Sequence, residues 1–129
     1  MAKIGWFESN SDWHELFGEM AEDEGHEIVV NTFMYFEALT AIRGLSKGDI
    51  AAAIVGSRLG GPNAGGGDGR EITSQLHKMV EGVVVIGLTG DPDGVEGADF
   101  NVLKHDGVVD PMDRIAGILR ELGQGAVGA

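Results

Sequence analysis

Two uninterrupted apolar segments constrain the fold of this chain more than any other feature. Residues 50–55 are apolar at every position, and residues 83–88 form a second such run that ends at Thr89. A strand that lacks polar alternation is normally covered on both faces, as the inner strands of a parallel sheet are. The pattern therefore predicts two central strands of a parallel sheet with helices on either side.

Shorter strands and amphipathic helices surround these two segments. The other expected strands cover residues 3–7, 26–31 and 100–103. The first helix is expected to begin at the N-cap Ser11 and to end at Gly25, where glycine is favoured after a helix. Apolar residues at helical spacing predict three more helices, at residues 35–42, at residues 70–81 and from Asp110-Pro111 onward.

Strands and helices that alternate along one chain imply a parallel sheet with right-handed crossovers and helices on both faces. The 129 residues suit one compact domain, expected at residues 1–123, with a flexible tail at residues 124–129. In such sheets the functional groups gather at the carboxyl ends of the strands. The residues at these ends are Glu8, Ser9, Gly56, Ser57, Thr89 and Lys104.

Composition and charge exclude several classes of function. The formal net charge is −12, from 9 basic and 21 acidic residues, so binding to nucleic acid is not expected. The acidity favours solubility, and a protein partner with a basic surface would complement it. The chain has no cysteine, no apolar run long enough to cross a bilayer and no signal-peptide pattern. A cytoplasmic protein that does not contact membranes is therefore expected.

Several motifs follow one another in an order that is typical of one family. Ile4-Gly5-Trp6-Phe7-Glu8-Ser9 is a strand followed by an acidic position, and Asp68-Gly69 precedes a helix. Val85-Ile86-Gly87-Leu88-Thr89-Gly90 ends a strand with a threonine, and Gly97-Ala98-Asp99-Phe100 leads to Lys104. Over nearly its whole length the chain resembles the receiver domain of bacterial two-component response regulators. The resemblance implies a flavodoxin-like (CheY-like) three-layer α/β fold with five parallel strands in the order 2-1-3-4-5.

The resemblance also implies a site, and this site is incomplete. The family uses a carboxylate nucleophile, two further acidic residues that hold Mg2+, and a lysine and a threonine or serine that contact the phosphoryl oxygens. Glu8 and Ser9 fall at the acidic positions, Gly56 at the phosphoacceptor, and Thr89 and Lys104 at the last two. Glycine has no side chain, so no catalytic residue is expected. Glu8 alone would be a poor metal site, and neither Mg2+ nor another cofactor is expected.

Ser57, the neighbour of Gly56, is the alternative acceptor. A serine hydroxyl needs an adjacent base, and no histidine lies in this loop. An ion pair between Glu8 and Lys104 is expected in place of an anion or metal site. His105 follows Lys104 where the family usually has a proline in cis, so we expect a trans bond or a shifted Lys104.

Two segments differ in length from the family pattern. The glycine-rich loop at residues 60–69 is longer, and we expect it to be mobile and to bind a partner. It is not expected to cradle a phosphate, because no Gly-Lys-Ser or Gly-Lys-Thr closes it. The segment between Thr89 and Lys104 is shorter by roughly two helical turns, so the fourth helix is expected to be shortened or missing.

The sequence thus predicts a stand-alone pseudo-receiver that acts through phosphorylation-independent protein–protein interaction and is not an enzyme. Pairing of two copies through the first or last helix is left open. Two other interpretations also stay open. One is a small-molecule or phosphate-ester binder, or an enzyme, that uses the glycine-rich loop; the other is a response regulator that is still phosphorylated.

Overall fold

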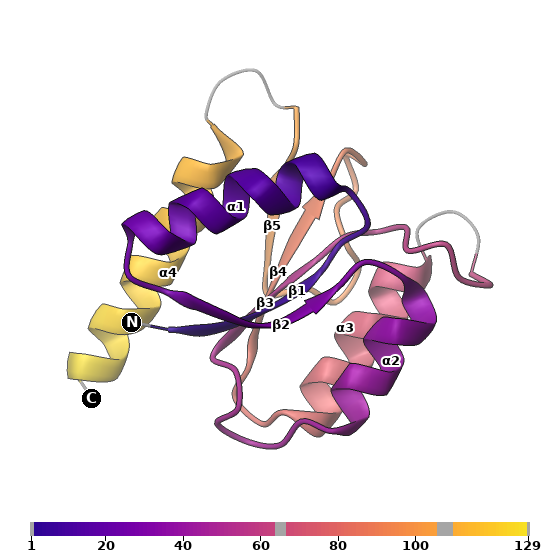
Figure 1. Cartoon of the computed structure of the whole chain (residues 1–129), viewed down its shortest axis with the longest axis horizontal. Coiled ribbons are helices and arrows are strands. Elements are labelled where there is room, and N and C mark those ends of the chain that lie inside the picture. The colour runs from indigo at the N-terminus through magenta and orange to yellow at the C-terminus, as the bar shows by residue number, and fades with distance from the viewer. Residues whose placement is uncertain (1, 64–66, 106–109, 129) are drawn as a thin grey trace.

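The computed structural model describes residues 2–63, 67–105 and 110–128, with side chains up to residue 123. Five parallel strands form one sheet in the order β2-β1-β3-β4-β5 (Figure 1). Their bounds are Lys3–Phe7 for β1, Glu27–Thr32 for β2, Ala52–Val55 for β3, Val84–Thr89 for β4 and Phe100–Leu103 for β5. The order and direction of the strands confirm the flavodoxin-like fold predicted from the sequence.

Helices cover both faces of this sheet. The helices α1 (Ser11–Asp23) and α4 (Pro111–Gly128) lie on one face, and α2 (Tyr35–Arg43) and α3 (Gly67–Met79) lie on the other (Figure 1). All four residues of β3 are buried, as its apolar sequence requires. The side chains alternate, so that Ala53 and Val55 pack with α2 and α3 while Ala52 and Ile54 pack with α1 and α4.

The core consists of these two layers of packed side chains. Phe17 and Ile54 belong to the layer under α1 and α4, and Leu76 belongs to the layer under α2 and α3; none of the three is exposed. Burying one such side chain stabilises a fold by about 1.5–3 kcal/mol. The two layers fix the strands relative to one another and therefore fix the strand ends at which the candidate site lies.

The start of α1 differs from the sequence expectation. Asn10 is the N-cap, and its side-chain oxygen accepts hydrogen bonds from the backbone N–H groups of Asp12 at 2.9 Å and Trp13 at 3.1 Å. Ser11 is therefore the first helical residue, because asparagine caps at least as well as serine and reaches the same donors. The other end agrees with expectation, since Gly25 adopts a positive φ of 75° just after the helix.

Other boundaries also move. The strand β2 begins one residue later than expected and β3 two residues later. The helix α3 begins at Gly67 instead of residue 70, so three residues of the expected glycine-rich loop are helical. Residues 64–66 of that loop lie outside the described residues. The helix α4 continues to Gly128, and the division of the chain after residue 123 stays a prediction.

The connection between β4 and β5 contains no helix, as the short segment predicted. Residues 90–99 form turns that fold back over the sheet, and Val95 is buried against Gly87. The side chain of Asn101 holds this connection, because its Oδ1 accepts a hydrogen bond of 2.7 Å from the backbone nitrogen of Val95. Among the described helices, none combines the length and the apolarity that a membrane span requires.

Candidate functional site

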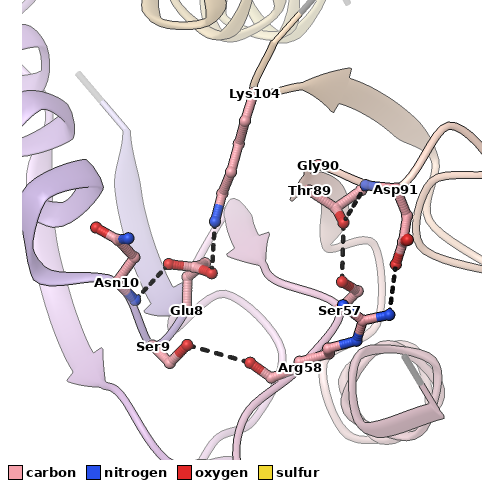
Figure 2. Close-up of a pocket in the computed structure, with 9 residues that line it drawn as sticks. All are labelled: Glu8, Ser9, Asn10, Ser57, Arg58, Thr89, Gly90, Asp91 and Lys104. Carbon is pink, nitrogen blue, oxygen red and sulfur yellow. Dashed lines mark hydrogen bonds and ion pairs between the residues drawn. The ribbon is translucent and has the colours of Figure 1, made fainter. Parts of the chain in front are cut away.

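A polar pocket of about 410 Å³ opens at the carboxyl ends of the strands (Figure 2). It contains five of the six residues that the sequence placed at this edge, whereas Gly56 lies behind the side chain of Glu8. The residues that line the pocket are Glu8, Ser9, Asn10, Ser57, Arg58, Thr89, Gly90, Asp91 and Lys104. The parallel topology brings them together, because β1, β3, β4 and β5 all end at this side of the sheet.

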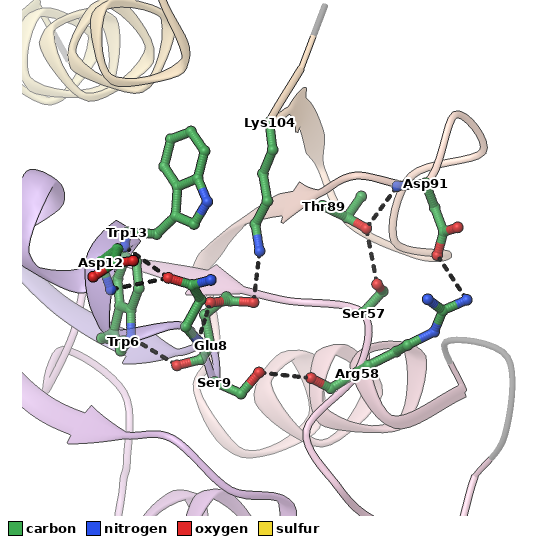
Figure 3. A network of polar contacts seen from close by, with 11 residues as sticks. Trp6, Glu8, Ser9, Asp12, Trp13, Ser57, Arg58, Thr89, Asp91 and Lys104 are labelled. Atoms are coloured by element: carbon green, nitrogen blue, oxygen red, sulfur yellow. Dashed lines mark hydrogen bonds and ion pairs between the residues drawn. The ribbon is translucent and has the colours of Figure 1, made fainter.

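Glu8 and Lys104 form the expected ion pair across the pocket. Nζ of Lys104 donates to Oε1 of Glu8 at 2.9 Å, and the two side chains are 14% and 5% exposed, respectively. The second carboxylate oxygen of Glu8 accepts a hydrogen bond of 2.6 Å from the backbone nitrogen of Asn10. The ammonium group also lies 5.9 Å from the centroid of the Trp13 ring, within the range of a cation–π interaction (Figure 3).

Gly56 lies directly after β3, where the resemblance places the phosphoacceptor. Its backbone nitrogen donates to the carbonyl of Phe7 at 2.9 Å, so the residue continues the pairing of β3 with β1. A Cβ atom at this position would lie 2.5 Å from Cγ of Glu8. The space that an acceptor side chain would need is therefore filled by Glu8.

Ser57 and Thr89 bind each other. Their hydroxyl oxygens lie 2.8 Å apart, and Oγ1 of Thr89 also accepts a hydrogen bond of 3.1 Å from the backbone nitrogen of Asp91. Ser57 is 9% exposed. Its hydroxyl thus faces another hydroxyl in this arrangement, and a hydroxyl is not the general base that a serine nucleophile needs.

The rim of the pocket holds Ser9, Arg58 and Asp91. The hydroxyl of Ser9 donates to the backbone carbonyl of Arg58 at 3.1 Å, pointing towards that loop (Figure 2). The guanidinium of Arg58 lies 3.8 Å from a carboxylate oxygen of Asp91. The side chain of Arg58 is 68% exposed, so solvent screens this pair and it contributes little to stability.

Asp68 holds the loop that follows β3, and the sequence did not indicate this role. It is 2% exposed and lies in the first turn of α3. Its carboxylate accepts backbone hydrogen bonds from Leu59 at 3.1 Å, Gly61 at 2.8 Å and Asn63 at 3.1 Å. Burial alone would raise the pKa of this carboxyl, but the three N–H donors outweigh burial and lower it. The only signal in the sequence is the Asp-Gly pair at the start of a helix.

Gly69 allows α3 to approach the pocket loop closely. Its backbone nitrogen donates to the carbonyl of Ser57 at 3.1 Å. A Cβ atom at Gly69 would lie only 2.3 Å from the carbonyl oxygen of Gly56, which is closer than any side chain permits. Together with the hydrogen bonds of Asp68, this contact ties residues 56–63 to the start of α3. The mobility expected for the glycine-rich loop at residues 60–69 stays a prediction.

Lys104 keeps the position that the resemblance gives it. Its backbone nitrogen donates to the carbonyl of Thr89 at 2.9 Å, which continues the pairing of β5 with β4. The bond to His105 is trans, as expected for a residue other than proline. The lysine therefore reaches the pocket without the cis bond that is usual in the family.

The described part of the chain holds no group of three or more His, Asp or Glu residues that could bind a metal ion. Within the pocket, Lys104 is paired with Glu8, and Arg58 is paired with Asp91.

The fold is similar to that of solved response regulator receiver domains. A CheY-like receiver domain protein from Methanospirillum hungatei gives a TM-score of 0.72 at 21% identity and covers 100% of this chain and 99% of its own. The response regulator TrrA from Thermotoga maritima, solved in complex with Mg2+-BeF, gives a TM-score of 0.71 at 21% identity, and the match covers 95% of this chain and 99% of the TrrA chain. The receiver domain of a sensor histidine kinase from Pseudomonas aeruginosa, with magnesium in its active-site cleft, gives a TM-score of 0.70 at 17% identity. The match covers 95% of this chain and 98% of the kinase receiver chain.

Identity at this level establishes the fold alone. No family model matches the sequence, and no curated protein matches it.

Proposed function

We propose that this chain is a receiver-type signalling domain that has lost aspartyl phosphorylation and acts by binding another protein. The observation that carries the proposal is Gly56, which follows β3 where the resemblance places the phosphoacceptor and has no side chain to accept a phosphoryl group. The fold supports a signalling role, and the residues of the site argue against the covalent step.

The neighbouring groups support the same proposal. Thr89 and Lys104 match the positions that contact a phosphoryl group, but Ser57 and Glu8 already engage them. Ser9 supplies a hydroxyl where the family has a carboxylate, and Glu8 is held by the lysine. Mg2+ prefers carboxylates in octahedral geometry, so we expect no magnesium-dependent chemistry and no enzymatic activity at this site.

The covalent step can be tested directly. We expect that incubation with Mg2+ and acetyl phosphate adds no mass to the protein, and that beryllofluoride with Mg2+ leaves the amide signals of Thr89 and Lys104 unchanged. A receiver domain with an aspartate after β3 serves as the positive control. A phosphoryl group mapped to Ser57, or to any other residue of the pocket, would contradict the proposal.

A partner with a basic surface fits the charge of the chain. The net charge of −12 would attract such a partner electrostatically, so binding should weaken as ionic strength rises. An affinity pull-down, repeated at increasing salt, identifies candidates and tests this dependence. Pairing of two copies is tested by sedimentation, with a monomer at all concentrations as the result that excludes it.

A second candidate function rests on the pocket of about 410 Å³, which is large enough for a small ligand. Lys104 and the hydroxyls of Ser57 and Thr89 would face a bound phosphate ester. A thermal-shift screen with nucleotides and phosphate esters separates the two functions, because a ligand that binds the native state raises its stability. We favour protein binding, since the carboxylate of Glu8 would repel an anion at the lysine.

A further inference from the structure

Glu8 and a side chain at position 56 compete for the same space. A Cβ atom added to Gly56 would lie 2.5 Å from Cγ, 2.7 Å from Oε1 and 3.0 Å from Cδ of Glu8. These distances lie at or below the limit of real Cβ contacts, and they involve the carbon at the base of the carboxylate as well as its tip. The observed position of Glu8 therefore requires glycine at position 56.

The carboxylate of Glu8 joins three elements from this position. It follows β1, its Oε1 accepts from Nζ of Lys104 after β5, and its Oε2 accepts from the backbone nitrogen of Asn10. Asn10 in turn caps α1 through Asp12 and Trp13. One carboxylate thus connects the end of β1, the end of β5 and the start of α1 (Figure 2).

The Glu8–Lys104 ion pair is buried enough to affect the stability of the fold. The side chains of Lys104 and Glu8 are 14% and 5% exposed, so solvent screens their attraction weakly, and either charge left alone would be costly. The pair of Lys47 and Glu81 offers a contrast: it spans 3.8 Å with side chains that are 74% and 80% exposed, and such pairs contribute little.

We propose that Glu8 is a built-in ligand of the pocket and that Gly56 is the residue that makes room for it. We call this arrangement the Glu8 latch and define it as the Glu8–Lys104 ion pair together with Gly56. Lys104 is thus paired with a carboxylate that follows β1, whereas Gly56, which follows β3, has no side chain to offer it. The latch rests on the proposed function and deepens it, because it holds the strand ends in one state without a covalent modification and so presents a constant surface to a partner.

The first test reads the ion pair itself. In Gly56→Ala, the new methyl group should displace Glu8, so the 15N signal of the Lys104 ammonium group should move to the position that it has in Glu8→Ala. Gly90→Ala is the matched control, because Gly90 lines the same pocket and an added Cβ there meets no atom within 4 Å. A Gly56→Ala protein whose Lys104 signal matches that of the unmodified protein would overturn the latch.

The second test is a double-mutant cycle on stability. Contacting residues show coupling that is large enough to measure, so Gly56→Ala should lower the folding equilibrium constant by about tenfold or more in the unmodified background and by less than about threefold in the Glu8→Ala background. Equal losses in the two backgrounds would refute the latch. If Gly56→Ala alone does not fold, the proposal requires the double variant to fold as well as Glu8→Ala does, and an unfolded double variant beside a folded Glu8→Ala also refutes it.

The two proposals fail separately. Absence of coupling between Glu8 and Gly56 would refute the latch, but it would not change the result expected with acetyl phosphate. A phosphoryl group on a residue of the pocket would refute the proposed function, whatever result the double-mutant cycle gives.

Discussion

The carboxylate of Asp68 lies 2.8 Å from the backbone nitrogen of Gly61, so a buried side chain of α3 holds the loop that follows β3. The same carboxylate also accepts from Leu59 and Asn63. A side chain that satisfies three buried or half-buried N–H groups at once cannot be replaced without leaving those donors unpaired.

We therefore expect Asp68→Ala to destabilise the fold by about 2–4 kcal/mol, since an unsatisfied buried donor costs about 1–3 kcal/mol and several are involved. Urea unfolding measures the change. Asp93→Ala, at an exposed position in the turn after β4, is the control and should change the free energy of unfolding by less than about 0.5 kcal/mol. Equal effects of the two substitutions would mean that the Asp68 hydrogen bonds do not stabilise the loop.

The lowered pKa of Asp68 predicts how stability depends on pH. A carboxyl whose pKa is lower in the folded state binds its proton more readily in the unfolded state. Its contribution is therefore complete above the unfolded pKa of about 3.9 and is lost as the pH falls through the folded pKa. Unfolding of the protein and of Asp68→Asn should be compared from neutral pH down to acid pH. The difference between their stabilities should shrink in the acid range, and a constant difference would contradict the prediction.

Removal of Lys104 should be costly because it leaves Glu8 buried and unpaired. We expect Lys104→Ala to destabilise the fold by about 3–5 kcal/mol, as is usual when one partner of a buried pair is removed. Lys47→Ala removes one partner of the exposed pair and should cost at most about 1 kcal/mol. Chemical denaturation of both variants provides the comparison. Similar losses of unfolding free energy would show that the Glu8–Lys104 pair stabilises the fold no more than an exposed pair does.

Gly87 should tolerate no larger residue. A Cβ atom there would lie 2.2 Å from Oδ1 of Asn101 and 2.9 Å from Cβ of Val95, so Gly87→Ala would push the β4–β5 connection off the sheet. Overpacking of this kind costs about 1–3 kcal/mol. Gly18→Ala in α1 meets no atom within 4 Å and should instead stabilise the helix, by about 0.5–1 kcal/mol. Thermal unfolding distinguishes the two, and a neutral Gly87→Ala would contradict the packing described here.

The sequence by itself determined the architecture. Uniformly apolar strands such as β3 and β4 alternate with amphipathic helices, and that periodicity allows few arrangements other than a parallel sheet covered on both faces. The short segment between Thr89 and Lys104 also predicted that the fourth helix would be shortened or missing, because chain length limits what a connection can form. Local signals such as the glycine after α1 were sufficient to predict where that helix ends, because they depend on only a few neighbouring residues.

The tertiary structure alone decided how the site is filled. Glu8 and Lys104 are 96 residues apart in the chain. Glu8 fills the space that a side chain at position 56 would need, and it does so because β1 and β3 lie side by side in the sheet. The role of Asp68 was hidden for the same reason, since its three donors lie in a loop whose path is set by packing against α3. Periodicity reports which face of an element is apolar, but it carries no information about which polar atoms from distant segments come within hydrogen-bonding distance.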